Sequence, residues 1–285
     1  MITATRYRAT AEINRQAKLG AEIARAQSDI STGKRINTAS DDPIAAGRIS
    51  EIRRAQADQA VWARNISTAQ SVASEVDTAM STMSDVFNRV KELTLAASTD
   101  SASDSDRAAA VQELTQLRTS LANLKTSTTP TGQALFPADA PLLISTSATQ
   151  RLAATAQASD VFGGITYAHS TGTLDDAIGN AISAISTSDP TARRTAVNEN
   201  ISDLDAAITH VTDQRAAQGV RAAQLDTAAD TMQSQATDLS EERSSLEDTD
   251  VAATVMKLNA KTLSLQAAQA AFAKVNRNTL FDFLS

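Results

Sequence analysis

The chain has 285 residues and a formal net charge of −7, and it is 42% apolar but only 3% aromatic, with alanine supplying nearly half of the apolar share. So few large side chains exclude a bulky globular core, while the scarcity of glycine and proline favours long helices. The absence of cysteine excludes disulfides and cysteine-ligated metals. Without an apolar run of about 20 residues, an integral membrane protein is not expected.

The charge is unevenly distributed along the chain. Residues 1–35 carry seven Lys and Arg against three Asp and Glu, and residues 254–285 carry four against one, so two basic ends flank an acidic middle. Basic arms can bind nucleic acid or membranes, but charges spread among apolar residues favour the polar faces of amphipathic helices. The first eight residues contain no apolar h-region, so no cleaved secretory signal is expected.

The first expected helix covers residues 4–32 and is amphipathic, with an apolar stripe that includes Ile13, Leu19, Ile23 and Ile30. The second begins at Asp42-Pro43, where Asp42 can cap free backbone N–H groups and Pro43 fits the first helical position. It runs to about Ala97 and carries a heptad seam that includes Trp62, Ile66, Val76, Met80, Met83, Phe87 and Val90.

A third expected helix starts at a cap formed by Asp104 or Asp106 and ends before residue 126, so that it forms a hairpin with the second. Residues 126–172 then hold three of the five prolines and four of the nine glycines. Short runs at 141–144, 161–162 and 165–167 predict short strands or extended loop. This segment is expected to be a small tip between two helical halves.

The second half repeats the helix-start signal at Asp189-Pro190, with Asp189 as the expected cap. A seam from Val197 to Val211 follows, and the apolar pattern resumes after Gly219 in what is expected to be a shifted frame, which predicts a local change of supercoil. The last amphipathic stretch and its ending carry Val255, Leu258, Leu265, Phe272, Leu280, Phe281, Phe283 and Leu284.

These elements predict a mainly α fold, a long antiparallel helical bundle or coiled coil built from both chain halves with a small β or irregular tip insertion. The expected domains are paired terminal helices at 1–40 and 254–285, a helical-bundle body at 41–125 and 174–253, and the tip at 126–173. The terminal stripes have no evident partner except each other or another molecule.

The sequence contains no pattern that predicts catalysis or the binding of a metal or cofactor. His169 and His210 have no carboxylate at metal-ligand spacing on a shared helix face. The paired carboxylates at 41–42, 104–106 and 248–250 lie at expected helix starts or polar faces, where capping explains them. Nucleophile elbows, Walker loops and dinucleotide fingerprints are absent from the sequence. The expectation is therefore no enzyme activity, no metal and no cofactor.

The segment from Ser31 to Ala46, Ser-Thr-Gly-Lys-Arg-Ile-Asn-Thr-Ala-Ser-Asp-Asp-Pro-Ile-Ala-Ala, and the ending Leu280-Phe-Asp-Phe-Leu284 closely resemble the bacterial flagellin superfamily. Within it, Asp-Asp-Pro-Ile in place of the Asp-Asp-Ala-Ala-Gly of flagellins is similar to the hook-associated protein 3 (hook–filament junction) family. The stretches at 88–93, 131–136 and 245–251 agree less specifically.

The resemblance implies a structural subunit that joins hook to filament in the bacterial flagellum, exported unfolded by the flagellar type III apparatus and located outside the cell. Its terminal helices, including the stripe residues named above, would be disordered in the monomer and mediate assembly. The implied partners are other copies of the chain, hook-associated protein 1, flagellin, and an export chaperone on residues 240–285, with no nucleic acid or membrane. The alternatives are flagellin itself and a coiled-coil adaptor that binds membrane or nucleic acid through its basic ends.

Overall fold

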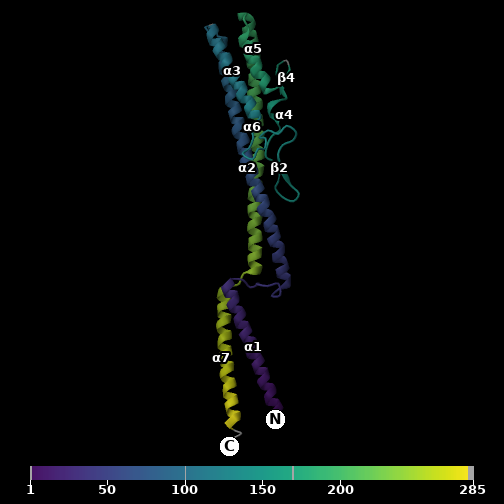
Figure 1. Cartoon of the computed structure of the whole chain (residues 1–285), viewed down its shortest axis with the longest axis vertical. Helices are drawn as coiled ribbons and strands as arrows, with labels where there is room; N and C mark the ends of the chain where they lie inside the picture. Colours follow the sequence, from purple (N-terminus) through teal and green to yellow (C-terminus); the bar gives the residue numbers. More distant parts are fainter. Residues whose placement is uncertain (1, 100, 169, 282–285) are drawn as a thin grey trace. The chain divides into compact units, whose positions relative to one another are not determined.

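The computed structural model describes the backbone of residues 2–99, 101–168 and 170–281, and the side chains of Tyr7 and of residues 9–274 within these ranges. Most of the described chain is helical, in α1 (Ile2–Thr32), α2 (Pro43–Ser98), α3 (Asp104–Lys125), α5 (Leu174–Ser186), α6 (Pro190–Glu247) and α7 (Val251–Phe281) (Figure 1). The remaining elements are short: β1 (Leu143–Ser145), β2 (Arg151–Ala153), α4 (Ala158–Phe162), β3 (Ile165–Thr166) and β4 (Thr171–Gly172). The predicted mainly α fold with a small β insertion is confirmed.

The chain forms two compact units, one of residues 1–57 and 235–285 and the other of residues 58–234. The division therefore falls inside α2 and α6, whereas the sequence predicted a terminal segment bounded near residues 40 and 254. The physical reason is local packing. Ile36 in the loop before α2, Ile49 of α2 and Leu246 of α6 share one apolar cluster, so the adjoining ends of α2 and α6 belong with the terminal helices.

The core of the second unit is built from α2, α3, α5, α6 and the inserted segment, and the seam between α2 and α6 is part of it. Of the seam residues predicted in α2, Trp62 is half-buried and the others are almost fully inaccessible, namely Ile66, Val76, Met80, Met83, Phe87 and Val90. Val197, Leu204 and Val211 of α6 are buried in the same cluster. Because α2 and α6 run antiparallel, Arg215 of α6 reaches Asp77 of α2, with Nε 2.8 Å from Oδ1.

The seam of α6 continues without the frame shift that the sequence predicted near residues 215–219. Buried or half-buried residues recur every seven positions along the helix, at Val197, Leu204, Val211, Gln218, Leu225, Met232 and Leu239. Gln218 is only 1% exposed, because its Nε2 donates to the Ala154 carbonyl oxygen at 2.9 Å. The prediction was wrong because a polar residue holds a core position.

The inserted segment lies along the side of the helices of the second unit (Figure 1). It is therefore not a tip. The β1–β2 hairpin rests on α2 and α6, with Ala154 in one small cluster with Ala69, Ala73 and Leu225. Residues 161–162, expected to be extended, belong to the short helix α4.

The start of α3 also differs from the prediction. The cap is Ser103, whose Oγ accepts from the Asp106 N–H at 3.2 Å, while an Asp106 carboxylate oxygen accepts from the Ser103 N–H at 2.9 Å. This reciprocal pair is a capping box.

Replacing Phe87 with Ala should destabilise the second unit by about 3–5 kcal/mol, because the ring is fully buried and its removal leaves a cavity in the seam. Leu95→Ala is the matched control on the same helix, since Leu95 is 45% exposed and should cost far less. Urea unfolding followed by circular dichroism measures both. Equal effects of the two substitutions would contradict the described seam.

Candidate assembly interface

The two terminal helices α1 and α7 lie side by side and antiparallel within the first unit (Figure 1). Their facing residues recur at alternating intervals of three and four, as in a coiled coil, at positions 12, 16, 19, 23, 26 and 30 of α1 and 254, 258, 261, 265, 268 and 272 of α7. Lys261 Nζ lies 3.0 Å from Glu22 Oε2 across the pair and fixes its register.

The predicted terminal residues fall into three groups. Those that face the partner helix are half-buried, namely Leu19, Ile23 and Ile30 in α1 and Leu258, Leu265 and Phe272 in α7. Ile13 and Val255 each lie one position outside the seam and are 55% and 37% exposed, so they do not face the partner helix, and their predicted role in assembly stays a prediction. The side chains of Leu280 and Phe281, and all of Phe283 and Leu284, lie outside the described residues.

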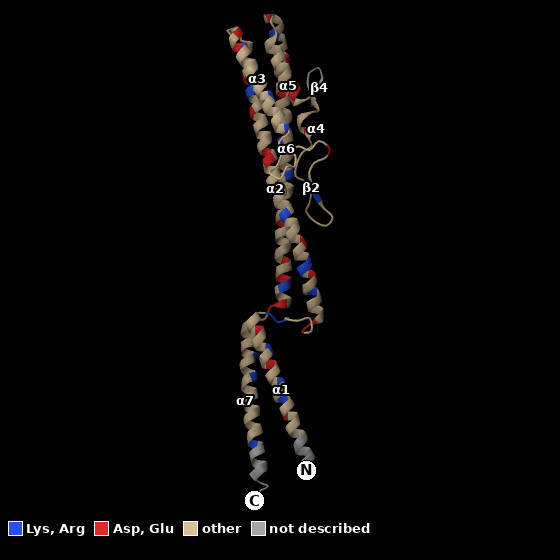
Figure 2. Cartoon of the chain, in the orientation of Figure 1, with Lys and Arg blue, Asp and Glu red and all other residues tan. Residues whose placement is uncertain are grey.

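The pair buries little of its own surface. Among the described residues of these two helices only Ala26 is fully buried. The outer face of α7 is also apolar, because Met256 and Leu263 are 67% and 68% exposed and lie among exposed alanines at 252, 260, 267 and 270. From Val251 to Lys274 the helix carries three lysines and no acidic residue, which leaves it mostly uncharged in Figure 2. An exposed apolar face of this kind marks a surface that packs against another molecule.

The segment after α1 is joined to the α6–α7 turn by backbone hydrogen bonds. The Arg35 N–H donates to the Glu247 carbonyl oxygen at 2.7 Å, and the Thr249 N–H donates to the Gly33 carbonyl oxygen at 2.9 Å. Gly33 has a φ of +68°, which side-chain-bearing residues rarely adopt. The structure thus brings together the motif at residues 31–46 and the stretch at 245–251, which the sequence analysis noted separately.

Glu247 is a buried carboxylate surrounded by cations. Its side chain is 5% exposed, and its Oε1 accepts from Lys34 Nζ at 2.6 Å and from Arg53 Nη2 at 2.7 Å. Arg243 Nε lies 3.7 Å from its Oε2. The hydrogen bond from Lys34, assisted by the charges of Lys34 and Arg53, holds the pKa of Glu247 below its ordinary value.

Sequence reasoning missed Glu247 because its partners are distant in the chain. Lys34 and Arg53 are separated from it by 213 and 194 positions. An acidic residue near the end of a long polar helix face carries no sign of burial. The resemblance of residues 245–251 to the family was the only signal that pointed to this stretch.

Asp42 and Asp189 cap the starts of α2 and α6, as their positions in the sequence predict. Asp42 Oδ1 accepts from the Ala45 N–H at 3.0 Å at the start of α2, and Asp189 Oδ2 accepts from the Ala192 N–H at 2.7 Å at the start of α6. Asp41 Oδ2 accepts from the Thr38 and Asn37 N–H groups at 2.9 and 3.1 Å, which lowers the pKa of Asp41. The loop before α2 is therefore tied down by both members of the Asp41-Asp42 pair.

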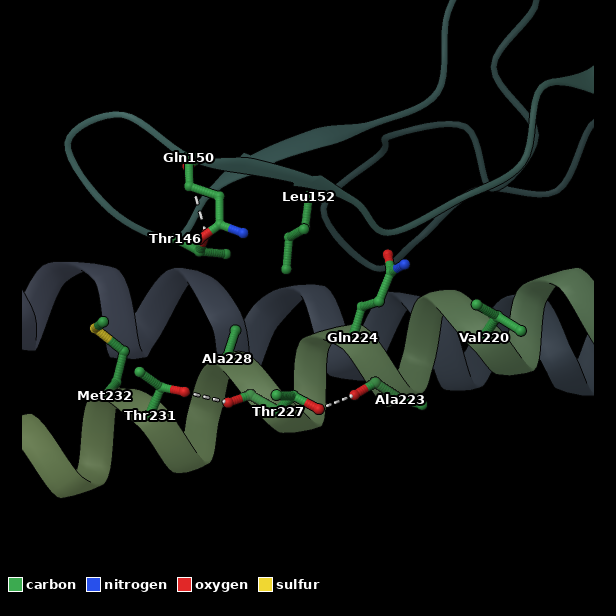
Figure 3. Close-up of a pocket in the computed structure, with 10 residues that line it drawn as sticks. All are labelled: Thr146, Gln150, Leu152, Val220, Ala223, Gln224, Thr227, Ala228, Thr231 and Met232. Atoms are coloured by element: carbon green, nitrogen blue, oxygen red, sulfur yellow. Dashed lines mark hydrogen bonds between the residues drawn. The ribbon is translucent and has the colours of Figure 1, made fainter.

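A groove of about 540 Å³ lies between the β1–β2 hairpin and α6 (Figure 3). Its lining holds no charged or titratable side chain, and the Thr227 hydroxyl is already donated to the Ala223 carbonyl oxygen at 2.9 Å. Over the described residues, histidine and acidic side chains form no group of three that could hold a metal ion. His169 is not among them.

No helix within the described residues combines the length and the apolarity that a bilayer crossing requires.

Fold and interface together define a helical-bundle protein built from both ends of its chain. Residues 4–140 match the bacterial flagellin N-terminal helical region, and residues 201–284 match the bacterial flagellin C-terminal helical region. The chain therefore belongs to the bacterial flagellin family, whose members are structural proteins of the flagellum.

Curated relatives point to one branch of that family. Over 114 residues the chain is 35% identical to flagellar hook-associated protein 3 of Salmonella typhimurium and 33% identical to the Escherichia coli protein of the same name. The aligned stretch is 38% of this chain and about a third, 34%, of each relative.

Solved structures share the fold. A structure assigned to a flagellar hook-associated protein of Vibrio parahaemolyticus has a TM-score of 0.65 and 16% identity, covering 73% of this chain and 100% of that one. The flagellar junction protein FlgL of Legionella pneumophila has a TM-score of 0.58 and 13% identity, covering 70% and 100%. At these identities the likeness shows the fold alone.

The lowered pKa of Glu247 predicts an acid-sensitive connection. Because the pKa is lower in the folded chain than in the unfolded one, the stabilisation is complete above the ordinary value of 4.5 and is lost as the pH falls through the folded value. Hydrogen-exchange protection of the Arg35 and Thr249 amides should therefore decline below about pH 4.5. The pKa of Asp41 is also lowered, so Glu247→Gln serves to separate the two carboxylates. If protection declines in this variant as it does in the wild type, Glu247 is not the group responsible.

Proposed function

We propose that this chain is a structural subunit of the bacterial flagellum that joins the hook to the filament, outside the cell, and acts by packing and not by catalysis. The observation that carries the proposal is the similarity to hook-associated protein 3 of two bacteria over 114 residues. The uncharged groove and the apolar outer face of α7 support it, because both suit a protein that binds other proteins.

Assembly proceeds through the terminal helices. The α1–α7 pair gains little from its own half-buried seam, and helices with so little burial are marginal by themselves. Burial of large side chains such as Met256 and Leu263 against neighbouring subunits contributes about 1.5–3 kcal/mol each. The helices α1 and α7 are thus ordered mainly in the assembled state and loose in the monomer.

The partners follow from the position between hook and filament. We infer contacts with other copies of the chain, with hook-associated protein 1 on the hook side and with flagellin on the filament side. Export runs through the flagellar type III apparatus without a cleaved signal, and a chaperone covers residues 240–285 before export. Such a chaperone would cover the exposed apolar face of α7, which otherwise promotes aggregation.

A second candidate within the family is flagellin, the filament subunit, because the matching models describe the flagellin terminal regions. Deletion of the gene separates the two. A strain that lacks the junction protein should build hooks and shed flagellin monomers into the medium, as seen by electron microscopy and immunoblotting. Cells with intact hooks that shed no subunits identify flagellin, and normal filaments or missing hooks contradict both assignments.

A pair of neighbouring leucines in α7 tests assembly through the terminal helices. Leu265 faces α1 and Leu263 lies on the outer face, so Leu265→Asp should weaken the α1–α7 pair, whereas Leu263→Asp should leave it intact. Both variants should fail to assemble, because burying the aspartate costs several kcal/mol. Sedimentation measures assembly, and limited proteolysis measures release of the terminal helices.

The second unit is the internal reference for this pair of variants. Its thermal unfolding should be unchanged in both, because neither leucine belongs to its core. Normal assembly of Leu263→Asp would show that the outer face of α7 is not used between subunits.

A further inference from the structure

Three cations converge on one buried carboxylate at the connection between α1 and α2. Glu247 Oε1 accepts from both Lys34 and Arg53, and Arg243 lies beside its Oε2. Leaving such a carboxylate without partners in the protein interior is far more costly than leaving an exposed one. The carboxylate of Glu247 therefore needs at least some of these cations to stay in place.

The cations come from two sides of the connection. Arg53 and Arg243 belong to α2 and α6, whose adjoining ends are also joined by Arg48 to Glu242 and by Arg243 Nη1 to Gln56 Oε1 at 2.9 Å. Lys34 alone belongs to the segment that leads from α1. If that segment moves away, Glu247 keeps two arginine partners and is not left as an unpaired buried charge.

We propose that Glu247 is a positioning residue whose carboxylate holds residues 33–36 against the ends of α2 and α6, and so fixes where α1 ends and where α7 begins. We call this set of contacts the latch. Its releasable contact is the one from Lys34, and the contacts from Arg53 and Arg243 stay in place when Lys34 leaves. The backbone bonds from Arg35 to Glu247 and from Thr249 to Gly33 close only when the latch is closed. This inference rests on the proposed function insofar as it concerns assembly.

Hydrogen exchange of the full-length monomer at neutral pH tests the latch. In Glu247→Gln, peptides containing the Arg35 and Thr249 amides should exchange at least about tenfold faster than in the wild type. Glu242→Gln is the matched control, because Glu242 is also paired with an arginine of α2 but its side chain is 39% exposed. It should change exchange at these two amides by no more than about twofold.

A second variant removes only the releasable contact. Lys34→Met should also accelerate exchange at Arg35 and Thr249, while the Ala45 and Ala46 amides in the first turn of α2 stay protected. Because Lys34 acts through Glu247, the double variant should exchange no faster than Glu247→Gln alone. This variant also serves if Glu247→Gln does not fold, since it leaves the carboxylate with both arginines.

Three results would overturn the proposal. The first is an exchange rate at Arg35 and Thr249 that does not change in Glu247→Gln. The second is an equal increase of that rate in Glu242→Gln. The third is a double variant of Lys34→Met and Glu247→Gln that exchanges faster than Glu247→Gln alone. Loosening of the second unit as well would show a general role in stability and not in positioning.

The assembly readout separates this inference from the function on which it rests. In sedimentation, Glu247→Gln should lower the assembled fraction several-fold while Glu242→Gln assembles like the wild type. A wild-type chain that does not assemble would refute the proposed function and leave the exchange result to decide the latch. A wild-type chain that assembles, with Glu247→Gln equal to it, would refute only the positioning role.

Discussion

Burial along an unbroken seven-residue repeat is the constraint on which the long helices depend. In α2 the buried positions include Ile52, Gln59, Ile66, Ala73, Met80, Phe87 and Thr94, each seven residues from the next. A helix of 56 residues can bury only a narrow face against one antiparallel partner, so each seam position must be filled along the whole length. Small residues suit this geometry, because alanines such as Ala69 and Ala73 allow backbones to approach closely.

Two polar side chains of α6 contact the inserted segment. Gln218 occupies a seam position of α6 and binds the carbonyl oxygen of Ala154, which holds the inserted segment on the helices. His210 Nε2 similarly lies 3.1 Å from the Val161 carbonyl oxygen. The cost of placing a polar side chain in an apolar seam is offset by the hydrogen bond it makes there. Gln218 and His210 therefore help to hold the insertion on α6.

The first unit has a different physical character. Its terminal helices share a half-buried seam and the Lys261–Glu22 ion pair, whereas the connection next to them contains a buried carboxylate, backbone bonds and the cluster of Ile36, Ala45 and Ile49. Stability is thus concentrated where α1 ends and α7 begins, and it is lower along the two helices. This distribution suits helices that complete their burial against other subunits while the connection between them remains fixed.

Local sequence signals are enough to predict the mainly α class, the starts of α2 and α6 at Asp-Pro pairs, and the seam from Ile66 to Val90, because helix periodicity and capping are properties of neighbouring residues. The unbroken frame of α6, the flanking position of residues 126–173 and the burial of Glu247 could not be predicted in this way. Each depends on a partner far away in the chain: Ala154 for Gln218, α2 and α6 for the hairpin, and Lys34 and Arg53 for Glu247. Periodicity treats a polar residue as exposed, and only its distant partner can place it in a core.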